Sequence, residues 1–494
     1  GSTKSERYLS RLCERSFLSM WSYPNIFRDQ GRKGLQGDGK EVCDLLVVFE
    51  NHLIIFSDKD CEFPSGENIA LNWARWCRKA IVKSASQVFG AERWLLDQPD
   101  RIFLDKACKV KFPLALPPKE KASVHRMVVT HGISDHCKKF FGGNSSGSLV
   151  FNPRLTGDDH TNVDRCIPFT YGHIAPEKGL VHVLDDTSLQ VLMSTLDTIT
   201  DFVDYLSAKE KLLMGDVGIM ALGEEEMLAS YMFNTTDEGR HTFSIPPDTS
   251  LYVFGEGEWD KFQASPKRAN QLKANEVSYL WDHIIEKFVG HIFSGTSEYL
   301  SHTDLSDQEK AFRLLAKENR TRRRLLGQAL LEVVDRTSEN QRATRTVLPM
   351  EDGEPCYVFL VLPRRNTDDE TQYRTVRREL LAQYCFITKL RVPNAKMIVG
   401  IATEPGSSSQ RSEDLGLYDA SAWGPEDKKK AEELESNLKA NGLLADRNWS
   451  RGLTYEFPPT AGPLNYRPVK GRDRNKPCFC NSGKKFKNCC GRHT

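Results

Sequence analysis

The sequence predicts a multidomain α/β protein, and three observations support this prediction. Apolar β-branched runs alternate with segments whose apolar residues recur every three or four positions, a pattern typical of strands and helices within one fold. At 494 residues, the chain is too long for a single hydrophobic core. Four cysteines gather close to its end, where we expect a small module that folds separately from the body.

The composition excludes several classes of protein. The net charge is only +1, so the whole chain is not a polycation that coats nucleic acid or membrane. No apolar run reaches the about 18 residues of a transmembrane helix, and we expect no membrane span. Nine of the 13 cysteines are scattered without the spacing of a disulfide framework, which indicates a reducing compartment. We therefore expect a cytoplasmic protein.

Changes in pattern along the chain divide it into six segments. The divisions are an α/β domain at 3–125, a mixed α/β region at 126–260, a helical region at 261–345, a second α/β unit at 346–451, a linker at 452–475 and a cysteine-rich module at 476–494. Four prolines in the linker favour an extended chain there.

The most informative part of the first segment is "VCDLLVVFENHLIIFSDKDC", residues 42–61. Two apolar runs, Leu45–Phe49 and Leu53–Phe56, flank Glu50-Asn51-His52, which predicts a β-hairpin. Asp44 opens the first strand, and Ser57-Asp58-Lys59 closes the second. Charged residues therefore meet at the open end of an otherwise apolar hairpin.

The register of the hairpin decides which of these groups meet. If Glu50 and Asn51 alone form the turn, position 44 pairs with 57, and Asp44, Ser57 and Lys59 share one face. If the turn takes three residues, Asp44 pairs with Asp58 and Lys59 points away. An acid lies beside a second polar group in either register. The simplest interpretation is an ordinary cross-strand ion pair between Asp44 and Lys59.

This hairpin and its flanks resemble the PD-(D/E)xK nuclease superfamily. In that family a helix precedes a hairpin carrying Asp…(Glu/Asp)-x-Lys, and a following helix often supplies a glutamine. Here the predicted helix Ser5–Met20 contains Glu14, and the predicted helix Asn68–Phe89 contains Gln87. The chain departs from the pattern in one respect, because Ser57 occupies the position two residues before Lys59.

The resemblance implies a restriction-endonuclease-like α/β fold and a catalytic set. Two carboxylates would hold Mg²⁺ or Mn²⁺, which polarises the phosphate and generates the attacking water. Asp44 is then the main ligand for magnesium, Glu14 or Asp58 the accessory ligand, Lys59 the cationic group and Gln87 a positioning group. The implied partner is DNA or RNA, and defence of a bacterium against foreign nucleic acid is a common setting for such enzymes.

The middle of the chain shows elements but no convincing site. Apolar residues at spacings of three and four predict one long helix over Ser188–Leu213. His131 and His136 have no partner cluster in the sequence and are expected to be ordinary surface or core residues. Four arginines between Arg320 and Arg324 begin a predicted helix, where they either clamp phosphates or form a solvated face paired with acids.

The second α/β unit alternates strand, helix and strand. Cys356–Leu362 and Ala395–Thr403 are predicted strands with a helix between them, which forms a βαβ-like unit. No glycine-rich phosphate loop follows either strand, so a structural or partner-binding role is expected rather than nucleotide binding.

The cysteines at the end of the chain follow the form C-x-C-x₈-C-C. Four thiolates suit the closed tetrahedral shell of structural zinc, and the intervening Asn481-Ser482-Gly483 favours a turn. Such a short segment needs the metal for its folding free energy. The predicted zinc ligands are Cys478, Cys480, Cys489 and Cys490. Nine Lys and Arg residues against Asp473 from position 467 onward also make this region attractive to an anionic partner.

This stretch closely resembles the SEC-C motif, whose form C-x-C-x-S-G-K-K-x-K-x-C-C is matched at every position. The resemblance implies structural Zn²⁺ and docking to a protein or ribosomal partner. For the whole chain we therefore expect a metal-dependent nuclease with a zinc-binding docking tail. The alternative is a non-enzymatic adaptor in which the hairpin domain is a degenerate nuclease scaffold.

Overall fold

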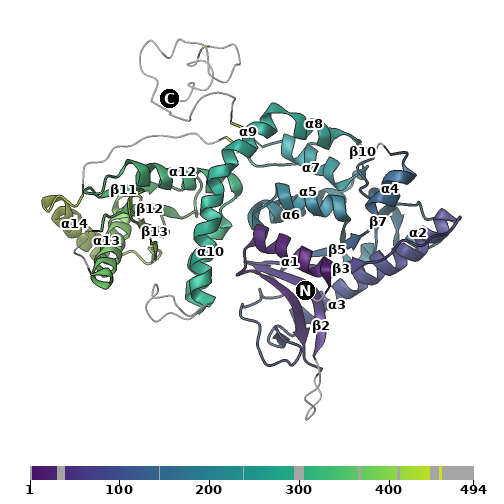
Figure 1. Cartoon of the computed structure of the whole chain (residues 1–494), viewed down its shortest axis with the longest axis horizontal. Helices are drawn as coiled ribbons and strands as arrows, with labels where there is room; N and C mark the ends of the chain where they lie inside the picture. Colours follow the sequence, from purple (N-terminus) through teal and green to yellow (C-terminus); the bar gives the residue numbers. More distant parts are fainter. Residues whose placement is uncertain are drawn as a thin grey trace. The chain divides into compact units, whose positions relative to one another are not determined.

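The chain folds into two compact units, Gly1–Arg268 and Ala269–Thr494, which are described separately below. The computed structural model describes residues 3–30, 39–143, 145–236, 239–293, 305–364, 369–408, 412–444, 455–458 and 485. Figure 1 shows the elements of both units. The described part is mixed α and β throughout, as the sequence predicts, although neither a nuclease fold nor a zinc knuckle is established by it.

Unit 1 is built on a six-stranded mixed sheet, which we call sheet A. Its strand order is β4-β1-β2-β3-β5-β8. The neighbours β4, β1, β2 and β3 are antiparallel, whereas β3, β5 and β8 are parallel. The strands are β1 (Ser22–Arg28), β2 (Lys40–Phe49), β3 (His52–Asp60), β4 (Ile102–Phe103), β5 (Ser123–His131) and β8 (His182–Leu184).

The predicted hairpin is confirmed as β2 and β3, joined by a two-residue turn. Phe49 pairs with His52, and the paired register continues to Leu45 and Phe56. Glu50 begins the turn with a φ of 51°, in the left-handed region that tight hairpin turns require. The first of the two registers expected above is therefore the one observed over the paired residues.

Helices cover both faces of sheet A, and the alternation of side chains along each strand tells which face is which. On one face, α3 (Lys83–Asp97) contacts β2, β3 and β5. The opposite face contacts α1 (Lys4–Phe17) and α5 (Asp186–Thr195). Thr3 caps α1 by accepting a hydrogen bond from the Glu6 amide, so the predicted amino-terminal helix begins one residue earlier than expected.

The predicted helix after the hairpin is present but is not uniform. It consists of α2 (Ile69–Cys77), a π-helical turn at Arg78–Val82 and α3, which Figure 1 shows as one long helical run. Asn68 caps its start through the amide of Leu71. The π turn adds one residue to the helix where Ala80 and Ile81 are completely buried.

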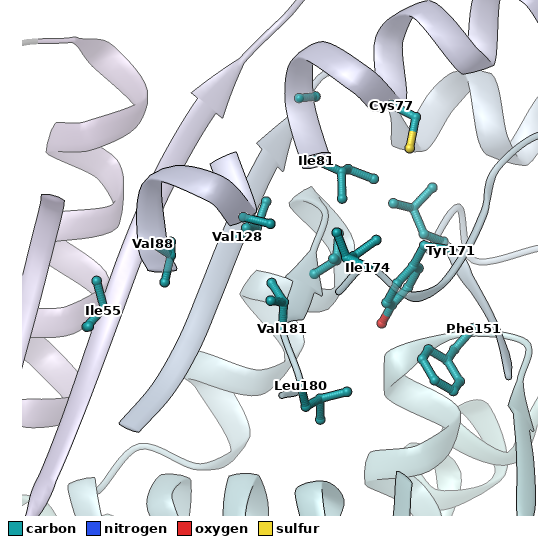
Figure 2. Packing of buried hydrophobic residues seen from close by; sticks show 14 of the residues in the cluster. Ile55, Cys77, Ile81, Val88, Val128, Phe151, Tyr171, Ile174, Leu180 and Val181 are labelled. Atoms are coloured by element: carbon teal, nitrogen blue, oxygen red, sulfur yellow. The ribbon is translucent and has the colours of Figure 1, made fainter. Parts of the chain in front are cut away.

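The core of unit 1 joins sheet A to a second, four-stranded sheet with the order β10-β9-β6-β7. Figure 2 shows this core: Ile55 and Val128 come from sheet A, Val88 from α3, and Phe151 and Tyr171 from the second sheet. The strands of the second sheet are β6 (Val150–Thr156), β7 (Thr170–His173), β9 (Gly218–Ala221) and β10 (Leu251–Phe254). The remaining helices of unit 1 are α4 (Ser134–Phe140), α6 (Ile199–Leu213), α7 (Glu224–Phe233) and α8 (Glu258–Ala264).

Two expectations about unit 1 need correction. The boundary placed after residue 125 lies inside β5, whose residues pair with β3 from His52 to Asp60, so sheet A continues across it. The single helix predicted over 188–213 is two helices, α5 and α6. The second helix begins after Thr198, whose side chain caps α6 by accepting a hydrogen bond from the amide of Asp201, a local bond that apolar spacing does not reveal.

Unit 2 contains a four-stranded sheet with the order β11-β12-β13-β14. Its strands are β11 (Ala343–Val347), β12 (Cys356–Val361), β13 (Met397–Thr403) and β14 (Asp414–Asp419), and its helices include α10 (Tyr279–Phe293), α11 (Leu305–Lys317), α12 (Arg320–Arg336), α13 (Glu370–Arg391) and α14 (Pro425–Ala440). The helix α9 (Pro266–Asn275) contains the boundary between the units. Strands β12 and β13 are parallel and are joined through α13, which confirms the predicted βαβ unit.

The arginines at the start of α12 are structural rather than exposed. Arg320 and Arg323 both donate to Asp282 of α10, at 2.8 and 2.6 Å. Arg323 also donates to the carbonyl of Ala316, and its side chain is only 1% exposed. Of the two interpretations of this cluster, pairing with acids is the one observed, although the pairing is buried rather than solvated.

No helix among the described residues is long and apolar enough to cross a membrane.

Candidate functional site

The candidate site lies where β2 and β3 separate at the open end of the hairpin. Beyond the last paired residues, the amide of Asp58 donates to Asp44 Oδ2 over 2.6 Å, so a side chain continues the hydrogen bonding between the strands. Asp44 Oδ1 accepts no hydrogen bond within the described part of the chain. The two acids predicted for this position are therefore neighbours.

The environment of Asp44 disfavours its negative charge. Burial raises the pKa of this carboxyl group to about 6, and the amide of Asp58 offsets only part of that effect. The neighbouring acids Glu41, Glu6 and Asp58 raise the pKa further. A cation placed beside Asp44 would stabilise its ionised form.

Asp58 is the most enclosed acid of the site. Its side chain is 0% exposed, and Oδ1 accepts a hydrogen bond from His131 Nε2 over 2.6 Å. Its second oxygen, Oδ2, is buried and has no hydrogen-bond partner among the residues that the structure describes. Because an unbonded buried carboxylate oxygen costs free energy, this atom is a strong candidate for a ligand contact.

His131 joins Asp58 to a third acid. Its Nδ1 lies 2.7 Å from Oδ1 of Asp186, and the amide of Gly132 donates to the other Asp186 oxygen. Burial alone would lower the pKa of His131, but the hydrogen bonds to Asp186 and Asp58 outweigh it and raise the pKa to about 10. The imidazole is therefore a cation at neutral pH, held between two carboxylates.

The parallel strands of sheet A explain why these three residues meet. Strands β3, β5 and β8 all end at the same edge of the sheet. The register pairs Asp60 with His131, so His131 and Asp58 lie on the same face, two residues apart in register. Asp186 begins α5 directly after β8, on the side of the sheet that α1 and α5 cover.

The remaining predicted residues lie elsewhere. Ser57 donates to Gln87 Oε1 of α3 over 3.4 Å, on the face opposite Asp58. Lys59 belongs to that same face by alternation and bonds to neither Asp44 nor Asp58. Glu14 is exposed on α1 and accepts from Ser10 over 3.1 Å. The structure thus joins the Asp44 carboxylate to the amide of Asp58, and it places Gln87 and Lys59 on the face opposite the Asp58 side chain.

Sequence reasoning missed His131 and Asp186. His131 was expected to be an ordinary residue, but it lies within hydrogen-bonding distance of two acids. A signal for it exists in the sequence, because His131 ends an apolar strand directly before Gly132 and Asp186 begins a helix after another such strand. In a parallel sheet those two positions meet at one edge, which is where ligands bind in open α/β sheets.

The four cysteines predicted as zinc ligands lie outside the described residues.

Comparison with known families assigns one segment of the chain. The family model of the SEC-C motif matches residues 474–492, which contain Cys478, Cys480, Cys489 and Cys490. No curated protein matches the chain, and no solved structure matches it.

Proposed function

We propose that unit 1 is a metal-dependent phosphodiesterase that cleaves DNA or RNA at the site of Asp44 and Asp58. The observation that carries this proposal is the buried Oδ2 of Asp58, which has no hydrogen-bond partner among the described residues, while the amide of the same residue binds the carboxylate of Asp44. The order of the elements adds support, since α1, the hairpin β2–β3 and the long helical run α2–α3 follow one another as the resemblance implies.

The donor atoms fit a hard divalent cation. Carboxylate oxygens are the ligands that Mg²⁺ prefers in proteins, and both acids offer an oxygen without a hydrogen bond in the described part of the chain. The bound ion would polarise a phosphate and lower the pKa of the attacking water. Asp44 and Asp58 would hold it, and the amide of Asp58 orients the Asp44 carboxylate.

His131 takes the place that the resemblance gives to the lysine. Its ring carries the positive charge of the site at neutral pH and fixes the orientation of Asp58 through Nε2. Asp186 in turn fixes the ring through Nδ1. The positive charge near the acids would stabilise negative charge that develops on the phosphate. Lys59 lies on the opposite face and is not assigned this role.

A cleavage assay tests this proposal. The substrates are supercoiled plasmid, single-stranded DNA and RNA, each with Mg²⁺, with Mn²⁺ and with chelator. Asp44→Asn and Asp58→Asn should each lower the rate about 100-fold or more, because a lost metal contact removes several kcal/mol of transition-state stabilisation. The matched control is Asp97→Asn, which alters an exposed acid paired with Lys119 and should leave the rate within about twofold.

Lys59→Ala distinguishes the site proposed from the structure, which excludes Lys59, from the catalytic set that the resemblance implies, which includes it. We expect it to slow cleavage much less than Asp58→Asn does, because Lys59 lies on the other face of sheet A. Cleavage that persists in both acid variants would remove Asp44 and Asp58 from the site. A folded chain that cleaves no substrate with any divalent ion would instead favour the adaptor with a degenerate nuclease scaffold.

For the SEC-C motif we propose structural zinc on Cys478, Cys480, Cys489 and Cys490, with docking of a protein or ribosomal partner as its role. The match to residues 474–492 supports this assignment, since four thiolates form a closed zinc shell. In metal analysis of the full chain, the double variant Cys489→Ser/Cys490→Ser should lose one thiolate-bound zinc. A tail that keeps its zinc in that variant contradicts the ligand set.

A further inference from the structure

A second polar cluster lies on sheet A, away from the mouth of the hairpin. It consists of His125 from β5, His182 from β8 and Glu210 from α6. Glu210 Oε1 lies 2.8 Å from His125 Nδ1 and 2.9 Å from His182 Nε2, and all three atoms lie within 4.8 Å of one another. Two nitrogens and one oxygen from three separate elements thus converge on one point.

Within the described residues, Glu210 forms ion pairs with histidines alone. Burial lowers the pKa of His182, so its imidazole is neutral at neutral pH. Burial would raise the pKa of Glu210, but hydrogen bonds from His125 and His182 outweigh it and hold the pKa well below its usual range. The neighbouring Lys209 pairs with Glu224 instead. The described residues give Glu210 no lysine or arginine partner.

The side chains of this cluster are of the types that bind a metal. A neutral imidazole and an ionised carboxylate are the protonation states that ligate a divalent ion. Both histidine side chains are 0% exposed, whereas that of Glu210 is 26% exposed. The cluster is therefore enclosed by protein on the histidine side and open to solvent on the carboxylate side, which leaves a path for an ion and for a water ligand.

His52 supports His125 from behind. Its Nδ1 lies 3.0 Å from His125 Nε2, and the two rings stack with centroids 5.3 Å apart. Histidines that ligate a metal usually donate their remote N–H to an acceptor, which fixes the tautomer and the ring orientation. With His52 Nδ1 accepting, His125 presents the lone pair of Nδ1 to the cluster.

We propose that His125 Nδ1, His182 Nε2 and Glu210 Oε1 bind a zinc ion, with water at the fourth position on the open side. Two imidazoles and one carboxylate suit zinc, whereas Mg²⁺ prefers an octahedron of oxygens. Zinc bonds of about 2.0–2.1 Å in a tetrahedron place ligand atoms about 3.3 Å apart, so Glu210 Oε1 must move away from each nitrogen by about half an ångström. This site is distinct from the four cysteines and from the site of Asp44 and Asp58.

Coordination chemistry separates this site from the thiolate site of the SEC-C motif. The full chain is loaded with Zn²⁺ for metal analysis and with Co²⁺ for absorption and X-ray absorption spectroscopy. Apart from any ion held by the oxygens of Asp44 and Asp58, we expect two metal ions per chain, one with sulfur ligands and one with both nitrogen and oxygen ligands. Glu210→Gln should remove the second ion and leave the thiolate-to-cobalt band unchanged. The control His173→Gln changes a half-buried histidine of β7 outside the cluster and should keep both ions.

Two further variants keep the proposal testable if Glu210→Gln does not fold. Cys489→Ser/Cys490→Ser leaves the cluster intact, and it should retain one ion with nitrogen and oxygen ligands. His52→Phe keeps a stacked ring but removes the acceptor behind His125, and it should weaken zinc binding about 10- to 100-fold. The proposal is overturned if wild type holds only the sulfur-bound ion, or if folded Glu210→Gln keeps both. If the cluster binds only protons, wild type would hold the sulfur-bound ion and no ion with nitrogen and oxygen ligands.

Discussion

Each unit contains a buried group of carboxylates, and the two groups are balanced in different ways. In unit 2, Asp414 and Glu404 face Arg377, whose Nε and Nη1 donate to them over 2.6 and 2.7 Å. Arg374 and Arg378 also donate to Asp414. Burial opposes the charge of Asp414, yet these arginines, Arg377 first, hold its pKa below the usual range.

In unit 1, no arginine of the described residues pairs with Asp44 or Asp58 at the mouth of the hairpin. Among the described residues, the Asp58 side chain bonds to His131, which it shares with Asp186, and its second oxygen has no hydrogen bond. The pKa of Asp44 is raised to about 6 by burial rather than lowered. Carboxylates saturated by arginine stabilise a fold, whereas carboxylates short of cations remain available to a ligand.

The largest stability effect is expected from Arg377→Met in unit 2. The side chains of Arg377 and Asp414 are 0% and 1% exposed, so the variant leaves two acids buried without their main partner. Breaking such a pair costs about 3–5 kcal/mol. The measurement is urea unfolding of the full chain, with hydrogen exchange of β13 and β14 as the local reporter.

The matched control is Arg364→Met, which removes an exposed ion pair of 3.1 Å with Glu370 at the start of α13. Exposed pairs contribute about 0–1 kcal/mol, so this variant should unfold nearly as wild type does. Equal losses from the two arginine variants would show that burial does not distinguish the pairs.

The next largest effect concerns His131 and alkaline pH. Its pKa is raised from 6.5 to about 10 in the folded chain, so the folded state keeps a proton that the unfolded state releases. Its stabilising contribution is complete below about pH 6.5 and is lost as the pH rises through about 10. Over this window the stability of His131→Gln should therefore fall by a few kcal/mol less than that of wild type does.

A nuclear magnetic resonance titration of histidine-labelled protein measures this pKa directly, with His131→Gln to assign the signal. The exposed His136 provides the comparison within the same chain. A signal of His131 that titrates near its ordinary pKa of 6.5 would contradict the cationic form between Asp58 and Asp186.

The smallest effect is expected from Asp44→Asn without a divalent ion. Because the pKa of Asp44 is raised from 3.8 to about 6, the stability of wild type should fall as the pH rises through that interval. The variant lacks this fall and should be about 1–3 kcal/mol more stable at pH 7. Added Mg²⁺ should stabilise wild type and leave the variant unchanged. A variant that is less stable at pH 7 would contradict the uncompensated charge of Asp44.

The sequence was sufficient for local structure and insufficient for contacts between distant segments. Alternating apolar runs predicted β2 and β3, and the pattern around Tyr373 and Leu380 predicted α13. The division of α5 from α6 depends on the side chain of Thr198 bonding a nearby amide, which leaves the apolar spacing of the helices intact. A side-chain cap of this kind begins a new helix without changing the spacing of the apolar residues, so the spacing does not reveal it.

Sequence analysis predicted Asp44 and Asp58 of the candidate site, but it did not predict His131 or Asp186. Asp44 and Asp58 are close in the chain, so hairpin geometry alone brought them together. His131 and Asp186 come from strands that lie beside the hairpin only because β3, β5 and β8 are parallel, a pairing that sequence spacing does not specify. Asp58 and Lys59 are adjacent in β3, so their side chains point to opposite faces of the sheet. The resemblance to the nuclease motif nevertheless assigned both residues to one catalytic set.

The parallel arrangement of β3 and β5 also governs how this protein can be dissected. A fragment that stops at residue 125 would retain both hairpin acids but would lack His131, most of β5 and the whole of β8. Such a piece exposes a long unpaired strand edge along β3, which invites self-association. A truncated protein should therefore end no earlier than residue 268, where the first compact unit ends. Loss of activity in a variant of that fragment then reports on the site rather than on an incomplete sheet.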